Sequence, residues 1–275
     1  MGQQGLISRI NELPRIESVL QELLEMVNRD AVDFDELAKK MAMDQVLLAR
    51  VLRLANSAQF GSVKGISNIH EAVIRVGVSP LRNLISSSIV AGSFPKIDTL
   101  DLKEYWSNCF EIAMIASAIA KDVDIDPNEA FTSGVLHNIG ELMIHTLEPE
   151  IALEIQRRAD NGEGIAKVQK ELLDVDAQAL GAALAETWKF PNRLVDAIAH
   201  VNCPSKAVNS KHLACLLYLA RDIHLHWDEI EGDEGKHTFL AQSKPAQALN
   251  LPSDAAAKVD KVRGQGRELA AELRS

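Results

Sequence analysis

The chain has 275 residues, of which 47% are hydrophobic and only 4% aromatic, and its formal net charge is −10. That length and apolar content are enough for one large folded domain or two smaller lobes. The negative balance opposes the attraction to phosphate on which most nucleic-acid binders depend, so nucleic acid is not an expected partner.

The sequence also argues against membrane insertion and secretion. It contains no run of about 18 apolar residues, the length that a membrane helix requires. Its first residues lack the apolar segment of a signal peptide. The cysteines, Cys109, Cys203 and Cys215, are odd in number and widely spaced, which is typical of reduced thiols. We therefore expect a cytoplasmic protein.

Helical spacing of apolar residues dominates the first third of the chain. It predicts a helix from Pro14 to about Asn28, and Asp33 and Asp44 each stand where they can cap a following helix. A further helix runs to Gly77, and Ser79-Pro80 begins the next. This helix ends near residues 94–95, where we place the boundary between two helical lobes, at approximately residues 1–95 and 96–228.

The second lobe is also predicted to be helical. A long helix from about Leu100 to Asp122 is followed by one that begins at Asp126-Pro127 and continues through the stretch GVLHNIGELMIH. No segment shows sustained strand alternation, so the fold class is all-α. The later helices are predicted at residues 149–159, 165–173, 177–188, 191–201 and 210–224, then a polar linker from residue 229 to 244, and a final helix from about 253 to 273.

The adjacent residues His137 and Asn138 form the most distinctive local motif. A His-Asp pair can bind a divalent cation through imidazole nitrogen and carboxylate oxygen, but here the second residue is a neutral amide. A buried histidine bonded to a backbone carbonyl is one interpretation, and a metal site is the other. His145, eight residues later, is interpreted as a cation near a helix C-terminus.

Two later segments supply other possible ligands. His200 lies near Asn202, and Asp222 lies in a stretch that also contains His224 and His226. Histidines two positions apart point in different directions on a helix, so these two are not expected to share an ion. A solvent-exposed helix end is the favoured interpretation for that pair.

Several segments, in order and without large gaps between about Leu13 and Ile223, resemble the HDOD domain, a bacterial signalling domain related to the HD superfamily of metal-dependent phosphohydrolases. The segments are LARVLRLANSAQFG, ISNIHEAVIRVGVSPLRNLI, YWSNCFEIAMIASAIA, AFTSGVLHNIGELMI and LGAALAETWKFPNRLVDAIAH. The resemblance implies an HD-domain-like helical fold, with an N-terminal lobe and a C-terminal lobe similar to the HD core. We expect the HDOD domain to span residues 1–228, and residues 229–275 to form the linker and C-terminal helix.

The resemblance also implies which positions correspond to the metal ligands of true HD phosphohydrolases. The first ligand position falls at or near Asn108, the His-Asp pair on His137 and Asn138, and the terminal Asp near Arg221, with Asp222 one residue away. Other accompanying histidines should fall near Ala177 and near Val201 and Asn202, beside His200. Amides at two ligand positions and a guanidinium at a third disfavour a cation. We expect no metal or other cofactor, and His137 would hold a divalent cation if one is bound.

Two functional classes therefore remain open, with a third less favoured. The first is a non-catalytic HDOD regulatory scaffold that contacts other signalling proteins. The alternative is an HD-type phosphohydrolase with a reduced ligand set of His137, Asn138, His200 and Asp222. The third is nucleic-acid binding by a basic group in the first lobe, for which a solvent-exposed face is the favoured interpretation; this group comprises Arg50, Arg53, Lys64, Arg75 and Arg82. The oligomeric state is not predicted.

The C-terminal helix presents a separate question. Gly264 and Gly266 fall in its middle and should weaken it unless it docks on the domain. Docking predicts that removal of the residues after Asp228 lowers thermal stability.

Overall fold

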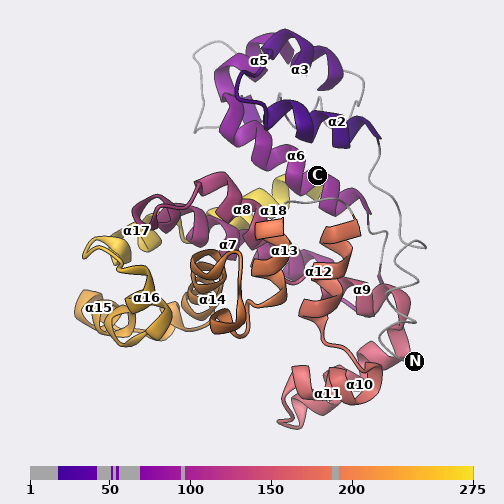
Figure 1. The fold of residues 1–275 in the computed structure, drawn as a ribbon, viewed down its shortest axis with the longest axis vertical. Coiled ribbons are helices and arrows are strands. Elements are labelled where there is room, and N and C mark those ends of the chain that lie inside the picture. The colour runs from indigo at the N-terminus through magenta and orange to yellow at the C-terminus, as the bar shows by residue number, and fades with distance from the viewer. Residues whose placement is uncertain are drawn as a thin grey trace. The chain divides into compact units, whose positions relative to one another are not determined.

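The computed structural model describes residues 18–41, 51, 54–55, 69–93, 97–187 and 192–274, and throughout these residues the regular elements are helices (Figure 1). The prediction of an all-α fold is confirmed. Within the same residues, no helix is both long and apolar enough to cross a bilayer. The described backbone falls into two compact units, one within residues 14–93 and the other within residues 94–271.

The smaller unit contains four described helices: α2 (Ser18–Val27), α3 (Phe34–Met41), α5 (Ile69–Val76) and α6 (Val78–Ser93). Asp33 caps α3 as predicted, because its Oδ1 accepts hydrogen bonds from the backbone N–H groups of Asp35 and Glu36 at 2.9 and 3.0 Å. Gly77, at φ 78°, separates α5 from α6, a backbone conformation that favours glycine. Of the helix predicted after Asp44, only residues 51, 54 and 55 are described, and these are helical.

Arg82 corrects one sequence-based interpretation. The expected solvent-exposed basic face included it, but its Nε donates to the backbone carbonyl of Val27 at 3.1 Å, and the residue is partly buried. A cation at the last carbonyls of α2 is favourable electrostatically. Arg82 thus stabilises the end of a helix, and of the other members of the proposed basic group only Arg75 lies within the described residues.

Helix α7 (Leu102–Ala120) is the central element of the larger unit. Asp101 caps it by accepting from the N–H groups of Lys103 and Glu104. It packs against three further helices, α8 (Pro127–Leu136), α14 (Lys211–His226) and α17 (Ala255–Val262). Buried aliphatic residues such as Ile115 and Ile119 fill these contacts. Both faces of α7 are therefore covered, which explains why a helix with such a weak polar stripe is stable here.

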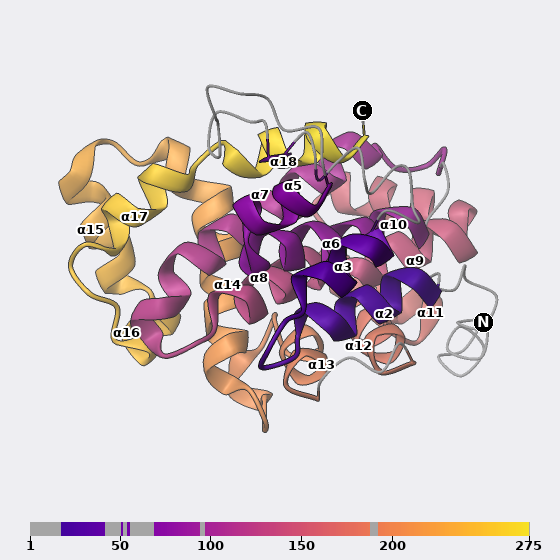
Figure 2. The ribbon, with the colours of Figure 1, turned by 90° about the horizontal axis from the view of Figure 1, so that it is seen from above.

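The remaining helices follow the predicted order closely. The start of α10 and both ends of α11 match the sequence analysis, and α12 begins at the predicted residue. Figures 1 and 2 both show α10 and α11 at one end of this unit and α15–α17 at the other. The bounds are α9 Ile139–Leu147, α10 Pro149–Asp160, α11 Ile165–Leu173, α12 Ala177–Thr187 and α13 Asn192–Ala199.

The C-terminal region differs from the prediction in two respects. The segment expected to be a polar linker contains α15 (Gly232–Gln242) and the start of α16 (Lys244–Leu249). The single helix expected from 253 to 273 is instead two helices, α17 and α18 (Gln265–Arg274), because Gly264 adopts φ 87° between them. This mostly polar segment contains a few apolar side chains that are buried in the core, namely Leu240, Leu249 and Val259.

Glu111 attaches this C-terminal region to α7. The side chain is only 1% exposed, and its two oxygens accept from the backbone N–H groups of Gly264 at 2.7 Å and Gly266 at 3.0 Å. The guanidinium of Arg263 lies 3.3 Å from the same carboxylate. A Cβ on residue 266 would lie 2.2 Å from the backbone nitrogen of Glu111, so only glycine fits. We call Glu111, Arg263, Gly264 and Gly266 the Glu111 cluster.

Candidate functional site

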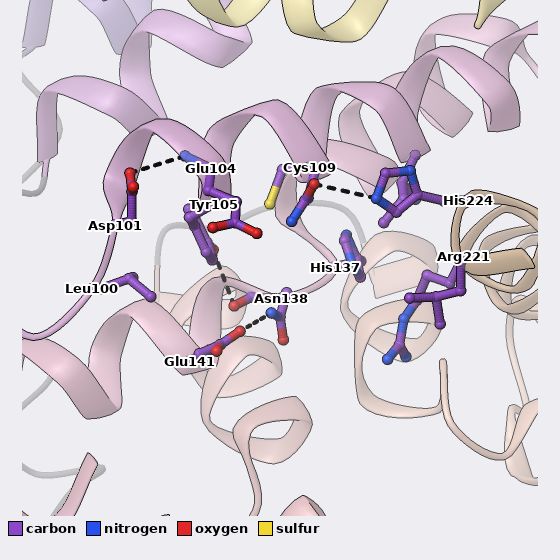
Figure 3. Close-up of a pocket in the computed structure, with 13 residues that line it drawn as sticks. Leu100, Asp101, Glu104, Tyr105, Cys109, His137, Asn138, Glu141, Arg221 and His224 are labelled. Atoms are coloured by element: carbon purple, nitrogen blue, oxygen red, sulfur yellow. Dashed lines mark hydrogen bonds between the residues drawn. The ribbon is translucent and has the colours of Figure 1, made fainter. Parts of the chain in front are cut away.

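A cavity of about 320 Å³ lies beside α7, bounded by the junction of α8 and α9 and by one face of α14 (Figure 3). It collects most of the residues that the sequence analysis singled out. Polar groups and apolar side chains contribute to its wall in similar measure. Its lining consists of Leu100, Asp101, Glu104, Tyr105, Asn108, Cys109, Ile112, His137, Asn138, Glu141, Arg221, His224 and Leu225.

His137 lies in the turn between α8 and α9, not within a continuous helix as the sequence suggested. It is 4% exposed, and its Nδ1 lies 2.6 Å from the carbonyl oxygen of Gly134. Burial, reinforced by the positive charge of Arg221, lowers the pKa of His137 to about 3. The imidazole is therefore neutral at pH 7. Since a carbonyl can only accept, Nδ1 carries the proton and Nε2 is a bare acceptor.

Asn138 is held by contacts on both sides. Its side-chain amide donates to the carboxylate of Glu141, and its backbone carbonyl accepts from the hydroxyl of Tyr105 at 3.0 Å (Figure 3). Burial raises the pKa of Glu141, while the bond from Asn138 and the charge of Arg221 partly offset that rise. The amide at position 138 thus serves to hold a buried carboxyl group.

Asn108 and His224 connect the cavity to the Glu111 cluster. His224 Nε2 lies 3.2 Å from the Oδ1 of Asn108, and His224 Nδ1 lies 3.4 Å from the Nη1 of Arg263. An amide oxygen accepts and a guanidinium donates, so both contacts require a neutral imidazole protonated on Nε2. Burial and the charge of Arg263 lower the pKa of His224, consistent with that form. The interpretation of His224 as a solvent-exposed helix end is therefore wrong.

Arg221 contributes the permanent positive charge of the cavity. Its Nη1 donates to the Oδ1 of Asn202 at 2.6 Å, and burial lowers its pKa. Among the described residues, no carboxylate lies within 4.0 Å of this guanidinium, which retains its charge because an arginine pKa is so high. Figure 3 shows Arg221 and His224 at one end of the cavity and Leu100 and Asp101 at the other.

Two predicted site residues do not line the cavity. Asp222 is turned away from Arg221 by one helical position and lies 3.7 Å from His226. His200 Nδ1 lies 2.9 Å from the backbone oxygen of Asp196, outside the cavity. The structure therefore brings together Asn108, His137, Asn138 and Arg221, and it separates His200 and Asp222 from them.

Sequence reasoning missed several lining residues, notably Tyr105 and Glu141. A signal for them existed in the spacing. Tyr105 and Asp101 precede Asn108 by three and seven positions, and Glu141 follows Asn138 by three, so each shares a helical face with a residue already singled out. Cys109, also missed, is fully buried, and burial raises the pKa of its thiol to about 12.

His145 corrects another expectation. It lies in the last turn of α9 but is buried, and its Nδ1 is 2.9 Å from the hydroxyl of Thr99. Burial lowers its pKa, which disfavours the cationic form that the sequence analysis assigned.

The described side chains around the cavity do not supply the set of donor atoms that a divalent cation needs. Across residues 97–187 and 192–274, no three His, Cys, Asp or Glu side chains lie close enough to share one ion. The two amides are weak ligands for first-row metals, and the guanidinium adds repulsion. The residues present do not fit the metal centre of an HD phosphohydrolase.

The helical fold with a cavity beside the central helix is of the HD-domain-like class. The sequence matches the HDOD domain over residues 13–204, so the chain belongs to the HDOD domain family.

Comparison with known proteins supports this assignment. The solved structure of a protein named "Putative phosphohydrolase", from Shewanella amazonensis SB2B, is 38% identical, with 98% of this chain and 97% of that chain covered and a TM-score of 0.87. An HDOD domain protein with unknown function from Geobacter sulfurreducens shares the fold at 21% identity, with 98% of each chain covered and a TM-score of 0.76.

An uncharacterized protein of Treponema pallidum (strain Nichols) is 28% identical over 204 residues, which is 73% of this chain. The match spans only 40% of the length of that curated relative.

Proposed function

We propose that this protein is a non-catalytic HDOD regulatory protein that acts in signal transduction through contacts with other proteins, in the cytoplasm. The observation that carries the proposal is the position of Arg221. Its guanidinium lines the cavity beside His137 and between amides, where a hydrolase of the superfamily requires anionic and imidazole ligands.

Electrostatics gives this observation its weight. Two like charges about 4 Å apart repel by roughly 4 kcal/mol at the effective dielectric constant of a protein surface. No carboxylate among the described residues neutralises Arg221 at short range. A divalent cation bound at His137 would therefore be repelled by Arg221.

The alternative function is an HD-type metal-dependent phosphohydrolase, and the name of the similar Shewanella amazonensis protein favours considering it. Its reduced ligand set would be His137, Asn138, His200 and Asp222. Only the first two line the cavity, and the second is an amide bonded to Glu141. A shared fold does not transfer a reaction when the residues that perform it differ.

The test is to measure metal content by mass spectrometry on full-length protein purified without a metal-affinity column, and phosphodiesterase activity with added Mn²⁺. We expect no stoichiometric metal and no activity. A double variant, Asn108→His with Asn138→Asp, is the informative comparison, since it returns two ligands at the positions that the family resemblance implies.

Metal bound by the double variant and not by the wild type would support the proposal, because it would trace the loss to these substitutions. Stoichiometric metal in the wild type that disappears in His137→Ala, while His212→Ala at an exposed position retains it, would overturn the proposal and favour the hydrolase.

A further inference from the structure

The guanidinium of Arg221 and the imidazole of His137 leave hydrogen-bonding capacity unused at one end of the cavity. Arg221 has five N–H donors, of which one bond, to Asn202, is made to a described residue. The described residues also supply no partner to Nε2 of His137, and this atom is not sealed inside the core. A fixed cation and a neutral acceptor therefore face the same small space.

We propose that this cavity binds a small organic acid without a metal. Arg221 would hold the anionic group, a carboxylate or a phosphate monoanion, and His137 Nε2 would accept from an O–H or N–H group next to it. An α-hydroxy acid and a singly protonated phosphate monoester both carry that pairing. Guanidinium groups favour such planar or tetrahedral oxyanions because their N–H donors form a fork.

The rest of the wall restricts the ligand further. Leu100, Tyr105 and Ile112 supply an apolar strip that an aliphatic or aromatic body can cover. Asp101 and Glu104, away from Arg221, would repel a second negative charge. The cavity volume of about 320 Å³ is at the small end of the range for ligand sites. Together these features select a compact monoanion and disfavour polyphosphates.

This inference rests on the proposed function only in that it takes the cavity to be free of metal. A ligand of this kind would supply the input to which a regulatory protein responds. Metal analysis of the same sample separates the two ideas: bound metal contradicts the proposed function, whereas metal-free protein that ignores organic acids contradicts this inference alone.

The experiment uses the whole chain treated with EDTA and follows thermal unfolding with four probes at about 10 mM. The pH is about 5.5, where a phosphate monoester is mostly singly protonated and His137 is still neutral. Mandelate carries a carboxylate with an adjacent hydroxyl, phenylacetate lacks that hydroxyl, phenyl phosphate carries the other anionic group, and benzyl alcohol is neutral. We expect mandelate or phenyl phosphate to raise Tm by about 3 °C relative to Tm with benzyl alcohol. A shift of this size is expected when the ligand concentration is well above Kd.

Variants assign the shift to the cavity. Arg221→Gln should abolish it, and Arg157→Gln, which removes an exposed arginine paired with Glu154, should retain it. His137→Asn should reduce the effect of mandelate to that of phenylacetate. Equal shifts in wild type and Arg221→Gln would contradict the proposal. The absence of a shift with both mandelate and phenyl phosphate would also contradict it.

A second readout requires no variant and covers the case in which Arg221→Gln fails to fold. Phenylglyoxal modifies accessible arginines, and peptide mass spectrometry reports the extent at Arg221 and Arg157 separately. The effective ligand should slow modification of Arg221 by several-fold and leave Arg157 unchanged. Equal rates at Arg221 with and without mandelate and phenyl phosphate would contradict the proposal.

Discussion

Two charged side chains of the larger unit, Glu111 and Arg221, differ in how the protein surrounds them. Glu111 is buried on α7, and Arg263 with two backbone N–H groups satisfies its carboxylate. Arg221, on α14, has one amide partner and no carboxylate within 4.0 Å among the described residues. A charge whose partners are all built into the chain serves the fold, whereas a charge without them is available to a ligand.

Removing the partners of Glu111 should have the largest effect on stability of the changes that test this contrast between Glu111 and Arg221. Truncation after Asp228 deletes Arg263 and both N–H donors, and with them the buried side chains Leu240, Leu249 and Val259. We expect a loss of more than about 5 kcal/mol in the free energy of unfolding, enough to leave little folded protein. Circular dichroism during heating measures this loss. Lys258→Ala, which removes only surface ion pairs, should lower stability far less than the truncation.

A single substitution at Glu111 sharpens the same point. Glu111→Ala removes the acceptor of two backbone N–H groups and one of the two carboxylate partners of the mostly buried Arg263. The free energy of unfolding, measured in urea, should therefore fall by about 3–5 kcal/mol. Glu154→Ala breaks an exposed pair with Arg157 and serves as the matched control, with an expected loss of stability much smaller than that of Glu111→Ala. Similar losses in the two variants would remove the distinction between the buried and exposed carboxylates.

The pH dependence of stability tests whether the imidazole of His137 is neutral in the folded protein. The pKa of His137 is about 3 when folded, against an ordinary value of 6.5. Between these pH values the unfolded chain binds a proton that the folded chain does not, so this histidine destabilises the fold as pH decreases. Its contribution amounts to about 1.4 kcal/mol per pH unit.

The measurement is urea unfolding from pH 7 to pH 4. His137→Asn should show a shallower loss of stability toward acid than the wild type. Leu100→Ala alters the far end of the same cavity, removes no titrating group or partner of one, and should retain the wild-type slope. A slope unchanged in His137→Asn would show that this imidazole is protonated in the folded state.

The smallest effect is expected at Arg221 itself. Arg221→Met removes a partly buried charge and keeps an apolar stem, so the free energy of unfolding should change by less than about 1 kcal/mol. Urea unfolding at pH 7.5 measures the change. A loss as large as that of Glu111→Ala would show that Arg221 has a structural role, and the contrast between the two charges would fail.

Much of the fold could be predicted because the relevant signals are local. Asp33 and the Asp126-Pro127 pair stand at helix starts, and apolar spacing placed α10, α11 and α12 to within two residues at each end. The C-terminal region was predicted less well. Its helices are stabilised by isolated anchors such as Leu240 and by Glu111, more than a hundred residues away in sequence, and no local pattern reports such contacts.

The site shows the same division. The resemblance brought attention to Asn108, His137, Asn138 and Arg221, which do meet in one cavity. It could not specify the helical phase of Asp222, and His200 is held by Asp196 outside the cavity. The direction of a side chain after a turn depends on tertiary packing, and tertiary packing cannot be read from a single sequence.

His224 has a thermodynamic consequence for the whole unit. One ring nitrogen contacts Asn108 in the cavity and the other contacts Arg263 in the Glu111 cluster, so a single neutral tautomer satisfies both. A ligand that draws Asn108 away weakens the hold on residues 263–266 through the same ring. Linkage is reciprocal, so a displacement of residues 263–266 would change affinity in the cavity by the same factor by which the ligand changes their attachment.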